Sequence, residues 1–280
     1  MYTVNYSLTE MKNKKLFLFT IVFFVVITIW WISLFVRGQQ SGTENDIFTS
    51  VYGAVAFWGG IAGLVIAKKW GGFKSILGKA FGSFALGLLA QFVGQICYSY
   101  YIIVLGMEVP YPSIGDFAFF STGFLYAFGS IQLIRSLGIR PALKTYQGRI
   151  GAILIPLLWA FSSYFFFLRG YVFDWSSPVV IILDLASPII DGVYISLIIL
   201  VYLLSKKFLG GIMKFPVLFL MVAVFSQAIA DYVFIFRASR EMVYSGGVSD
   251  YIYLLSYTLM TIALMYLGFV FKKLTDGSND

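Results

Sequence analysis

The 280-residue chain is 60% hydrophobic and 12% charged. Soluble domains are about 25% charged, so this composition excludes a soluble globular protein and predicts a multi-pass membrane protein. The formal net charge of +7 does not indicate nucleic-acid binding, because the basic residues lie in short segments beside apolar runs. There is no histidine, which excludes a Ser-His hydrolase and a histidine-ligated zinc or haem within these residues. The lone Cys97 allows no intrachain disulfide.

Eight apolar runs follow one another along the chain, each long enough to cross a hydrocarbon core of about 30 Å. The first begins at Leu16, after Lys12, Lys14 and Lys15, and no small-residue cleavage site follows it. We therefore interpret it as an uncleaved span rather than a signal peptide. The prediction is an all-α fold, a single integral membrane domain over residues 1–280, with helices at about 16–36, 47–67, 77–105, 116–134, 150–168, 178–204, 215–236 and 250–271.

The loop charges predict the orientation of these helices. With the N-terminus inside, sixteen of the twenty Lys and Arg residues fall in cytoplasmic segments, and most acidic loop residues fall on the other side. The exceptions are Arg37, Arg169, Arg237 and Arg240. Cytoplasmic loops of membrane proteins are enriched in Lys and Arg. We therefore expect the cell (cytoplasmic) membrane as the location, with both termini in the cytoplasm.

The two halves of the chain resemble each other. Polar positions recur at a nearly constant spacing: Asp46 and Asp184 at 138 residues, Gln95 and Asp231 at 136, and Asp116 and Asp250 at 134. Four helices per half give both halves the same orientation. The spacing predicts a parallel 4+4 repeat about an axis along the membrane normal.

The span at 178–204 carries two acids, Asp184 and Asp191, with Pro188 between them. A carboxylate at the bilayer centre costs about 2.5–3.5 kcal/mol on insertion scales, so we expect the acids to have a use. Their spacing of seven residues places them on one helix face, together with Ser187. Pro188 removes one backbone hydrogen bond and frees a carbonyl, which can open a polar pocket.

Polar residues at a similar depth occur on two further spans. Gln91, Gln95 and Tyr98 lie on the third, and Gln227 and Asp231 lie on the seventh. No Lys or Arg lies in mid-span, so the acids must be protonated, hydrogen-bonded, or matched by a bound cation or cationic ligand. If these helices adjoin, we expect a ligand-binding pocket in the outer half of the membrane. Its predicted lining is Gln91, Gln95, Tyr98, Asp184, Ser187, Asp191, Tyr194, Gln227 and Asp231.

Asp116 and Asp250 stand at the starts of the fourth and eighth spans. A carboxylate there caps free backbone amides and is favoured by the helix dipole, so we expect both to be outer-loop caps. Ser113-Ile-Gly-Asp116 is similar to the GxGD motif of intramembrane aspartyl proteases. However, the first Gly is Ser, and Asp116 falls at an outer helix start. The sequence therefore predicts no catalytic residue, no metal site and no cofactor.

Several motifs resemble the multi-helix N-terminal membrane sensor region of prokaryotic diguanylate cyclases and related signalling proteins. They are the segment 109–117 (VPYPSIGDF), Ser187-Pro188-x-x-Asp191, Ala230-Asp231-Tyr232 and Ser245-Gly-Gly-x-x-Asp250. The resemblance covers roughly residues 90–260 and departs at Ser187, where Tyr is usual. The chain ends at Asp280 without a cyclase or kinase output domain. The resemblance therefore implies a sensor-like membrane module and not cyclase activity.

Three functional hypotheses follow. The first is a stand-alone sensory or ligand-binding membrane module that signals to a separate protein. The second is a small or proton-coupled transporter that uses Asp184 and Asp191 as protonatable sites. The third is that the acids only join helices, through hydrogen bonds worth about 0.6–2 kcal/mol each. The lipid bilayer is the expected partner and nucleic acid is not. The ligand, the signalling partner and the oligomeric state stay open.

Overall fold

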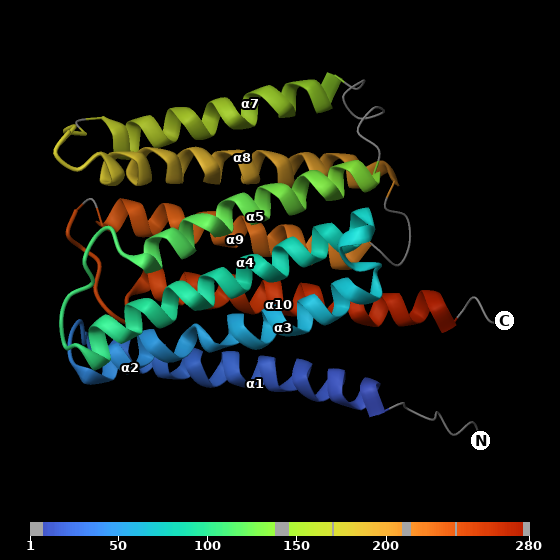
Figure 1. Cartoon of the computed structure of the whole chain (residues 1–280), viewed down its shortest axis with the longest axis horizontal. Helices are drawn as coiled ribbons and strands as arrows, with labels where there is room; N and C mark the ends of the chain where they lie inside the picture. The colour runs from blue at the N-terminus through green and yellow to red at the C-terminus, as the bar shows by residue number, and fades with distance from the viewer. Residues whose placement is uncertain (1–7, 138–145, 170, 209–213, 239, 277–280) are drawn as a thin grey trace.

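The computed structural model describes residues 8–137, 146–169, 171–208, 214–238 and 240–276 (Figure 1). These residues are mainly helical and contain no strand, which confirms the all-α prediction. The long helices are α1 (Leu8–Val36), α2 (Thr43–Tyr52), α3 (Ala54–Lys69), α4 (Ile76–Ser99), α5 (Ile114–Leu137), α7 (Tyr146–Ser163), α8 (Pro178–Phe208), α9 (Lys214–Ala238) and α10 (Val248–Asp276). Short turns of other helical types are η1 (Gly72–Lys74), η2 (Tyr100–Val104) and η3 (Tyr164–Leu168).

Seven helical stretches in the described ranges are long and apolar enough to cross a membrane. They match the predicted spans other than the one at 150–168. That span falls on a shorter apolar stretch, Ile153–Leu168, in α7 and η3. Helices suit this environment because a spanning segment must satisfy every backbone hydrogen bond internally. The protein is therefore a multi-pass membrane protein.

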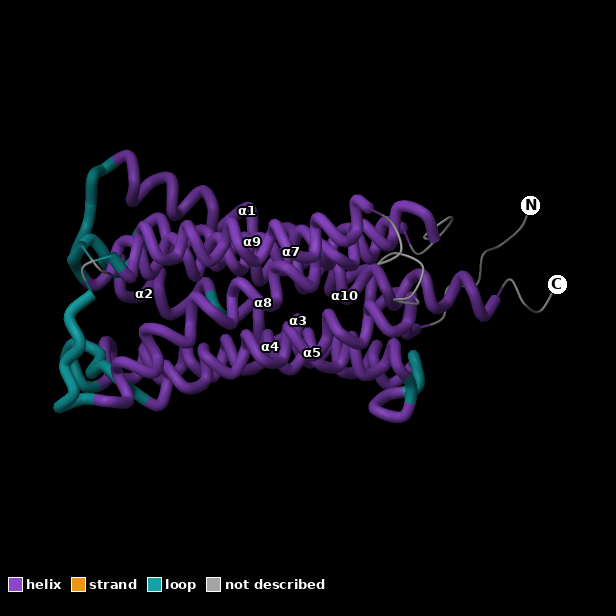
Figure 2. The backbone as a smooth tube through the Cα atoms, turned by 90° about the horizontal axis from the view of Figure 1, so that it is seen from above, coloured by secondary structure: helices purple, strands orange, loops and turns teal. Residues whose placement is uncertain are grey.

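Six helices pack side by side in a closed ring. Around it, α3 packs on α4, α4 on α5, α5 on α8, α8 on α9, α9 on α10, and α10 on α3. Helix α1 packs outside the ring on α10, and α7 packs outside it on α8. The helices run along the long axis of the molecule and the loops gather at its two ends (Figure 2). Helix α1 begins and helix α10 ends at the same end of the molecule (Figure 1). We call this end the termini end and the opposite end the distal end.

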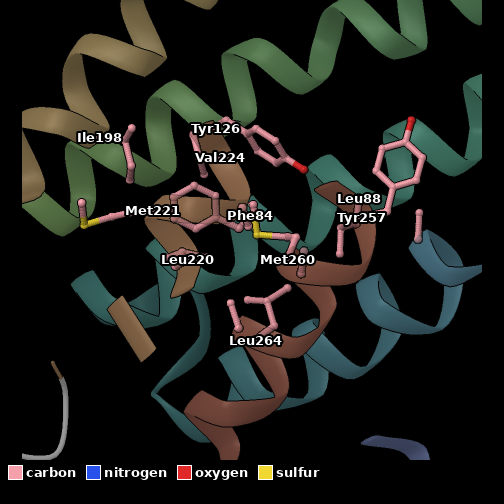
Figure 3. Packing of buried hydrophobic residues seen from close by; sticks show 14 of the residues in the cluster. Phe84, Leu88, Tyr126, Ile198, Leu220, Met221, Val224, Tyr257, Met260 and Leu264 are labelled. Atoms are coloured by element: carbon pink, nitrogen blue, oxygen red, sulfur yellow. The ribbon is translucent and has the colours of Figure 1, made fainter. Parts of the chain in front are cut away.

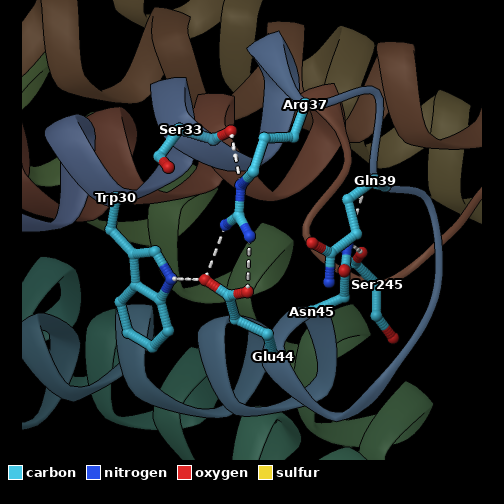
Figure 4. Close-up of polar contacts among 7 residues, drawn as sticks. All are labelled: Trp30, Ser33, Arg37, Gln39, Glu44, Asn45 and Ser245. Atoms are coloured by element: carbon cyan, nitrogen blue, oxygen red, sulfur yellow. Dashed lines mark hydrogen bonds and ion pairs between the residues drawn. The ribbon is translucent and has the colours of Figure 1, made fainter.

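The charged residues separate between these two ends. The basic residues Lys68, Lys74, Lys79 and Arg135 belong to helix ends or turns at the termini end. Arg140 and Lys144 lie outside the described residues. At the distal end, Arg37 forms an exposed ion pair with Glu44 at 2.7 Å, and Trp30 donates a hydrogen bond to the same carboxylate at 3.0 Å (Figure 4). An exposed pair of this kind contributes little stability, about 0–1 kcal/mol. Its effect is to join α1 to α2.

Helix α10 lies at the centre of the packing. Its Tyr257, Met260 and Leu264 belong to a buried cluster that also includes Phe84 from α4 and Met221 from α9 (Figure 3). The share of buried residues in its apolar window, 67%, is above that of the other spans in the described chain. Motion of α10 would therefore disturb the packing of every helix that touches it.

Three glycines on α3 let that helix approach its neighbours closely. A Cβ added at Gly59 would overlap the side chain of Thr261 on α10, and one at Gly63 would lie 2.7 Å from Leu264. One added at Gly60 would lie 3.0 Å from the backbone oxygen of Ala85 on α4. Small residues at helix contacts are the usual means of close packing in membranes.

Gly59→Ala is expected to destabilise the protein by about 1–3 kcal/mol, because the new methyl group forces α3 away from α10. Thermal unfolding followed by intrinsic fluorescence in detergent measures this. Thr261→Ala makes room for the new methyl group, and Ala is a better helix former than either Gly or Thr. The double variant should therefore recover most of the lost stability. Ile61→Ala, at an exposed position of the same helix, is the control with a small effect. A double variant no more stable than Gly59→Ala alone would contradict the close contact.

Candidate functional site

Two acids within the ring act on each other, the buried Asp191 on α8 and the partly buried Asp231 on α9. Asp191 is 6% exposed and interacts electrostatically with Asp231. The Asp231 carboxylate accepts hydrogen bonds from Tyr194 at 2.8 Å, Tyr253 at 2.9 Å and Gln227 Nε2 at 3.1 Å. These donors come from α8, α10 and α9, so one carboxylate joins three helices. We call Asp191, Asp231, Tyr194, Tyr253 and Gln227 the acidic cluster.

Further buried hydrogen bonds extend the acidic cluster along α10. Ser256 Oγ donates to Gln227 Oε1 at 2.9 Å, and Tyr257 donates to Gln91 Oε1 on α4 at 2.7 Å. The rings of Tyr253 and Tyr257 lie 5.9 Å apart between their centroids. Residues 253, 256 and 257 share one helix face because they are separated by one turn or less. This face of α10 therefore touches polar groups of α4, α8 and α9.

Two buried oxygens near the acidic cluster have no hydrogen-bond partner, Asp191 Oδ2 and the hydroxyl of Tyr126 on α5. Tyr126 is 0% exposed, its ring packs on Tyr194 at 6.0 Å, and it interacts electrostatically with Asp231. Buried polar atoms are almost always paired, because an unpaired one costs about 1–3 kcal/mol. Each of these two oxygens can therefore still take a hydrogen-bonding partner.

The acidic cluster contains no positive charge. Among the described residues, no Lys or Arg is one of the groups that interact with Asp191 or Asp231. Tyrosine and glutamine donors satisfy carboxylate lone pairs but carry no charge. The cluster can therefore be neutral only through bound protons or a bound cation.

Asp184 belongs to a different structure at the distal end. It accepts a hydrogen bond from Tyr111 at 2.5 Å and one from Tyr171 at 2.8 Å. These tyrosines come from the loop before α5 and the loop before α8, so Asp184 holds two loops together. Burial and the bond to Asp184 raise the pKa of Tyr171 to about 12. The same two causes raise the pKa of Tyr111 well above its ordinary value.

Asp250 forms a second distal junction, at the start of α10. Its Oδ2 accepts from Thr49 and from the backbone N–H of Gly246, both at 2.8 Å, and its Oδ1 accepts from Tyr52 at 3.3 Å. The bond from Gly246 caps the start of α10, and the other two join α10 to α2. Asn45 of α2 also donates to the Ser245 carbonyl at 2.8 Å (Figure 4).

The helix break between α2 and α3 explains the position of Gln95. Gly53 forms the break, and its N–H bonds to Val51 instead of the Thr49 carbonyl one turn earlier. Gln95 Nε2 on α4 donates to that freed carbonyl at 2.7 Å. A Cβ at Gly53 would lie 2.5 Å from Gln95 Cγ, so only glycine fits this contact.

Asp116 lies in the first turn of α5. Its Oδ2 accepts from the backbone N–H of Ser113 at 2.6 Å and from the Ser113 hydroxyl at 2.7 Å, and its Oδ1 accepts from Tyr98. A side chain that reaches back to the residue before its helix is a capping box. Tyr98 is therefore part of this cap.

The structure brings together some of the nine residues proposed as one pocket and separates others. Asp191, Tyr194, Gln227 and Asp231 lie in the acidic cluster, and Gln91 reaches it through Tyr257. The others bond elsewhere: Gln95 to the α2–α3 break, Tyr98 to Asp116, Asp184 to Tyr111 and Tyr171, and Ser187 Oγ to the Leu183 carbonyl at 2.7 Å.

Sequence reasoning missed four residues around the acids, Tyr126, Tyr253, Ser256 and Tyr257. The three residues on α10 could have been found from the sequence, because they lie on the same helix face as Asp250. Nothing in the sequence distinguishes Tyr126, because it is one aromatic residue among many in an apolar span.

One apolar cleft lies between α7, α8 and α9 and another between α8 and α9, and neither is lined by an acidic residue. The larger, of about 310 Å³, includes Trp159 and Ser162 of α7 and Phe225 of α9. Trp159 donates to the Pro188 carbonyl at 2.8 Å and packs against Gly192, beside Asp191. This bond helps to dock α7 on α8. It does not use the carbonyl that the missing N–H of Pro188 leaves free, which is that of Asp184.

No group of three or more Cys, Asp or Glu side chains that could hold a metal ion occurs within the described ranges. No family model, curated protein or solved structure matches the chain.

Asp184→Asn is expected to lower the pKa of Tyr171 from about 12 towards its ordinary value of about 10. A neighbouring carboxylate favours the neutral phenol, so its replacement makes ionisation easier. Titration of ¹³Cζ-labelled tyrosine by NMR measures the midpoint, with the signal assigned by Tyr171→Phe. Asp174→Asn is the matched control and should change the midpoint less. An unchanged midpoint in Asp184→Asn would contradict the Asp184 junction.

Proposed function

We propose that this protein is a sensory, ligand-binding membrane module in which the charge of the acidic cluster sets the position of α10. The observation that carries the proposal is the convergence of buried polar contacts on this helix. Asp231, Gln227 and Gln91 on α9 and α4 bond to Tyr253, Ser256 and Tyr257 of α10. A change of charge or occupancy at Asp191 and Asp231 would alter these bonds.

Helix α10 also suits the role of an output element. It runs from the Asp250 junction at the distal end to Asp276, and it extends past its neighbours at the termini end (Figure 1). A helix packed on both sides moves as a unit when one set of contacts changes. We propose that a partner protein reads this movement at the termini end.

The proposed topology has eight spans with the distal end outside and both termini in the cytoplasm. Helix α7 and η3 together run from Tyr146 to Leu168, which supports α7 as the eighth span, since about 20 residues cross the hydrocarbon core. The basic residues at the termini end support the orientation through the positive-inside rule. The cell membrane is the proposed location.

Matching contacts support the proposed 4+4 repeat. Thr122 of α5 donates to the Gly87 carbonyl of α4 at 3.3 Å, and Ser256 of α10 donates to the Ala223 carbonyl of α9 at 3.3 Å. These two bonds are related by the offsets of 134 and 136 residues predicted from the sequence. The contact of α3 with α10 likewise corresponds to the contact of α8 with α5.

The resemblance to the membrane sensor region of diguanylate cyclases favours sensing. The second candidate is a small or proton-coupled transporter, which the proposed repeat favours because many transporters are built from repeats. Both use the acidic cluster. They differ in whether a substrate crosses the membrane.

The sensory proposal predicts that α10 shifts by about 1–2 Å when the acidic cluster loses charge. Spin labels at Tyr146→Cys and Leu274→Cys, exposed positions at 79% and 46%, report the α7–α10 distance in a Cys97→Ser background. Electron–electron resonance in nanodiscs should give a different distance distribution for Asp191→Asn and Asp231→Asn than for the parent. Acidification of the parent from about pH 8 to 5 should shift it in the same direction.

Asp174→Asn, which removes one exposed loop charge, is the control and should leave the distances unchanged. Identical distance distributions in all variants would contradict the sensory proposal. The transporter is tested in liposomes that contain a pH-sensitive dye. Net acidification of the lumen that Asp191→Asn abolishes would establish transport, whereas a sensor gives no net flux.

A further inference from the structure

The two apolar clefts beside α8 join into one groove, because they share Ile199 of α8 and Phe225 of α9 in their linings. The larger cleft extends to Trp159 on α7. The other extends along α8 and α9 to Tyr202 and Leu218, toward the termini end. All lining side chains except Ser162 are apolar or aromatic, and none is charged. We call the two clefts together the α8–α9 groove.

The α8–α9 groove opens on the outer surface of the bundle. Toward the distal end, α7 and η3 close on α9: Trp159 and Phe167 pack on Tyr232, with ring centroids 5.1 and 4.5 Å apart. Toward the termini end the groove takes the place of such contacts. There Val222 and Phe225 of α9 are 44% and 45% exposed. The opening of the groove therefore faces the hydrocarbon that surrounds a membrane protein.

The size and surroundings of the groove favour a hydrocarbon chain over a protein segment. The larger cleft holds about 310 Å³ along the roughly 10 Å of α7 between Ile155 and Ser162. Its cross-section is thus about 30 Å², whereas a helix about 10 Å across needs about 80 Å². An acyl chain is narrow, and it is what the bilayer presents to an apolar opening. A chain in the groove gains dispersion contacts that a void would lose.

Basic residues stand at the termini end of all three helices that form the groove. Arg149 lies in the first turn of α7 and is exposed. The backbone places Lys206 one turn after Tyr202 in α8, and Lys214 one turn before Leu218 in α9. The groove thus leads from an uncharged interior to a basic end. The cytoplasmic leaflet carries anionic lipids, and basic sites between helices on that side suit their headgroups.

Trp159 connects the groove to the acidic cluster. Its ring lines the groove, and its Nε1 donates to the Pro188 carbonyl of α8 at 2.8 Å. The same ring lies so close to Gly192 that an added Cβ would overlap it. Gly192 directly follows Asp191. A chain that presses on the Trp159 ring therefore acts on the turn of α8 that carries the buried acid.

We propose that the α8–α9 groove binds an acyl chain of an anionic phospholipid from the leaflet at the termini end, and that this lipid regulates the acidic cluster. The chain lies along α8 and α9, the headgroup lies at the basic end, and Trp159 transmits occupancy to Asp191. This inference rests on the proposed function, because it names the stimulus that the sensor reads.

The test adds phosphatidylglycerol or phosphatidylcholine to delipidated full-length protein in detergent. Native mass spectrometry counts the retained lipid, and thermal unfolding measures the stabilisation that a ligand of the folded state gives. Phosphatidylglycerol should bind saturably. It should be preferred about fivefold for each basic side chain that its headgroup meets, and Arg149→Gln should lower this preference.

Filling the groove should abolish the binding. Ile199→Phe adds volume where the two clefts meet, and Val222→Phe does so from an exposed position, without repacking the core. Ile189→Phe is the matched control, since it is 63% exposed on α8 and does not line the groove. Phosphatidylglycerol retention that both groove variants leave unchanged would overturn the proposal. Equal retention of the two lipids would overturn the anionic headgroup.

The spin-label distances separate this inference from the sensory function. In phosphatidylcholine nanodiscs, added phosphatidylglycerol should change the α7–α10 distance distribution of the parent and leave that of Ile199→Phe unchanged. A response to Asp191→Asn but not to phosphatidylglycerol would refute regulation by the lipid and keep the sensory function. Phosphatidylglycerol binding in the groove with no distance change in any variant would keep the lipid site and refute the sensory function.

Discussion

The interior of this protein depends on one constraint. Its carboxylates lie in a membrane-embedded bundle without a counter-charge, so they need hydrogen-bond donors. An acid at the centre of a span costs about 2.5–3.5 kcal/mol on insertion scales, and the cost falls only if the bundle supplies donors. Asp231 obtains its donors from its own helix, from α8 and from α10. The acid therefore fixes the relative position of three helices, and the polar face of α10 extends this to α4.

Tyrosine meets two requirements of this interior, because it packs in the apolar core and donates a hydrogen bond. Tyr194 and Tyr257 are fully buried side chains of the hydrophobic core, and each also donates a hydrogen bond to an acid or a glutamine. A phenol packs as a large apolar ring and carries one polar group at its tip. At the distal end the buried Tyr52 does the same for Asp250. Tyr111, which donates to Asp184, is instead an exposed loop residue. Packing and polar contacts are thus coupled, so a change at one acid is also a change in packing.

The sequence predicted the spans well and the site only in part, for a physical reason. Hydropathy averages over about 20 residues, so single residues hardly affect the position of a span. A pocket depends on the direction of each side chain around its helix and on its neighbours. Asp184 and Asp191 share a face, yet Asp184 lies near enough to the helix end to bond to loop tyrosines. Ser187 turns to the backbone one turn earlier, as serine in helices often does.

The proposed repeat bears on whether the acids are merely structural. On its offsets, Asp191 and Asp231 correspond to Gly53 and Gln95 in the first half. There a glycine and an amide meet in direct contact, and the amide satisfies the Thr49 carbonyl. The first half thus solves the same packing problem with neutral groups. Two acids at the equivalent place, if both are ionised, add electrostatic repulsion that packing does not require.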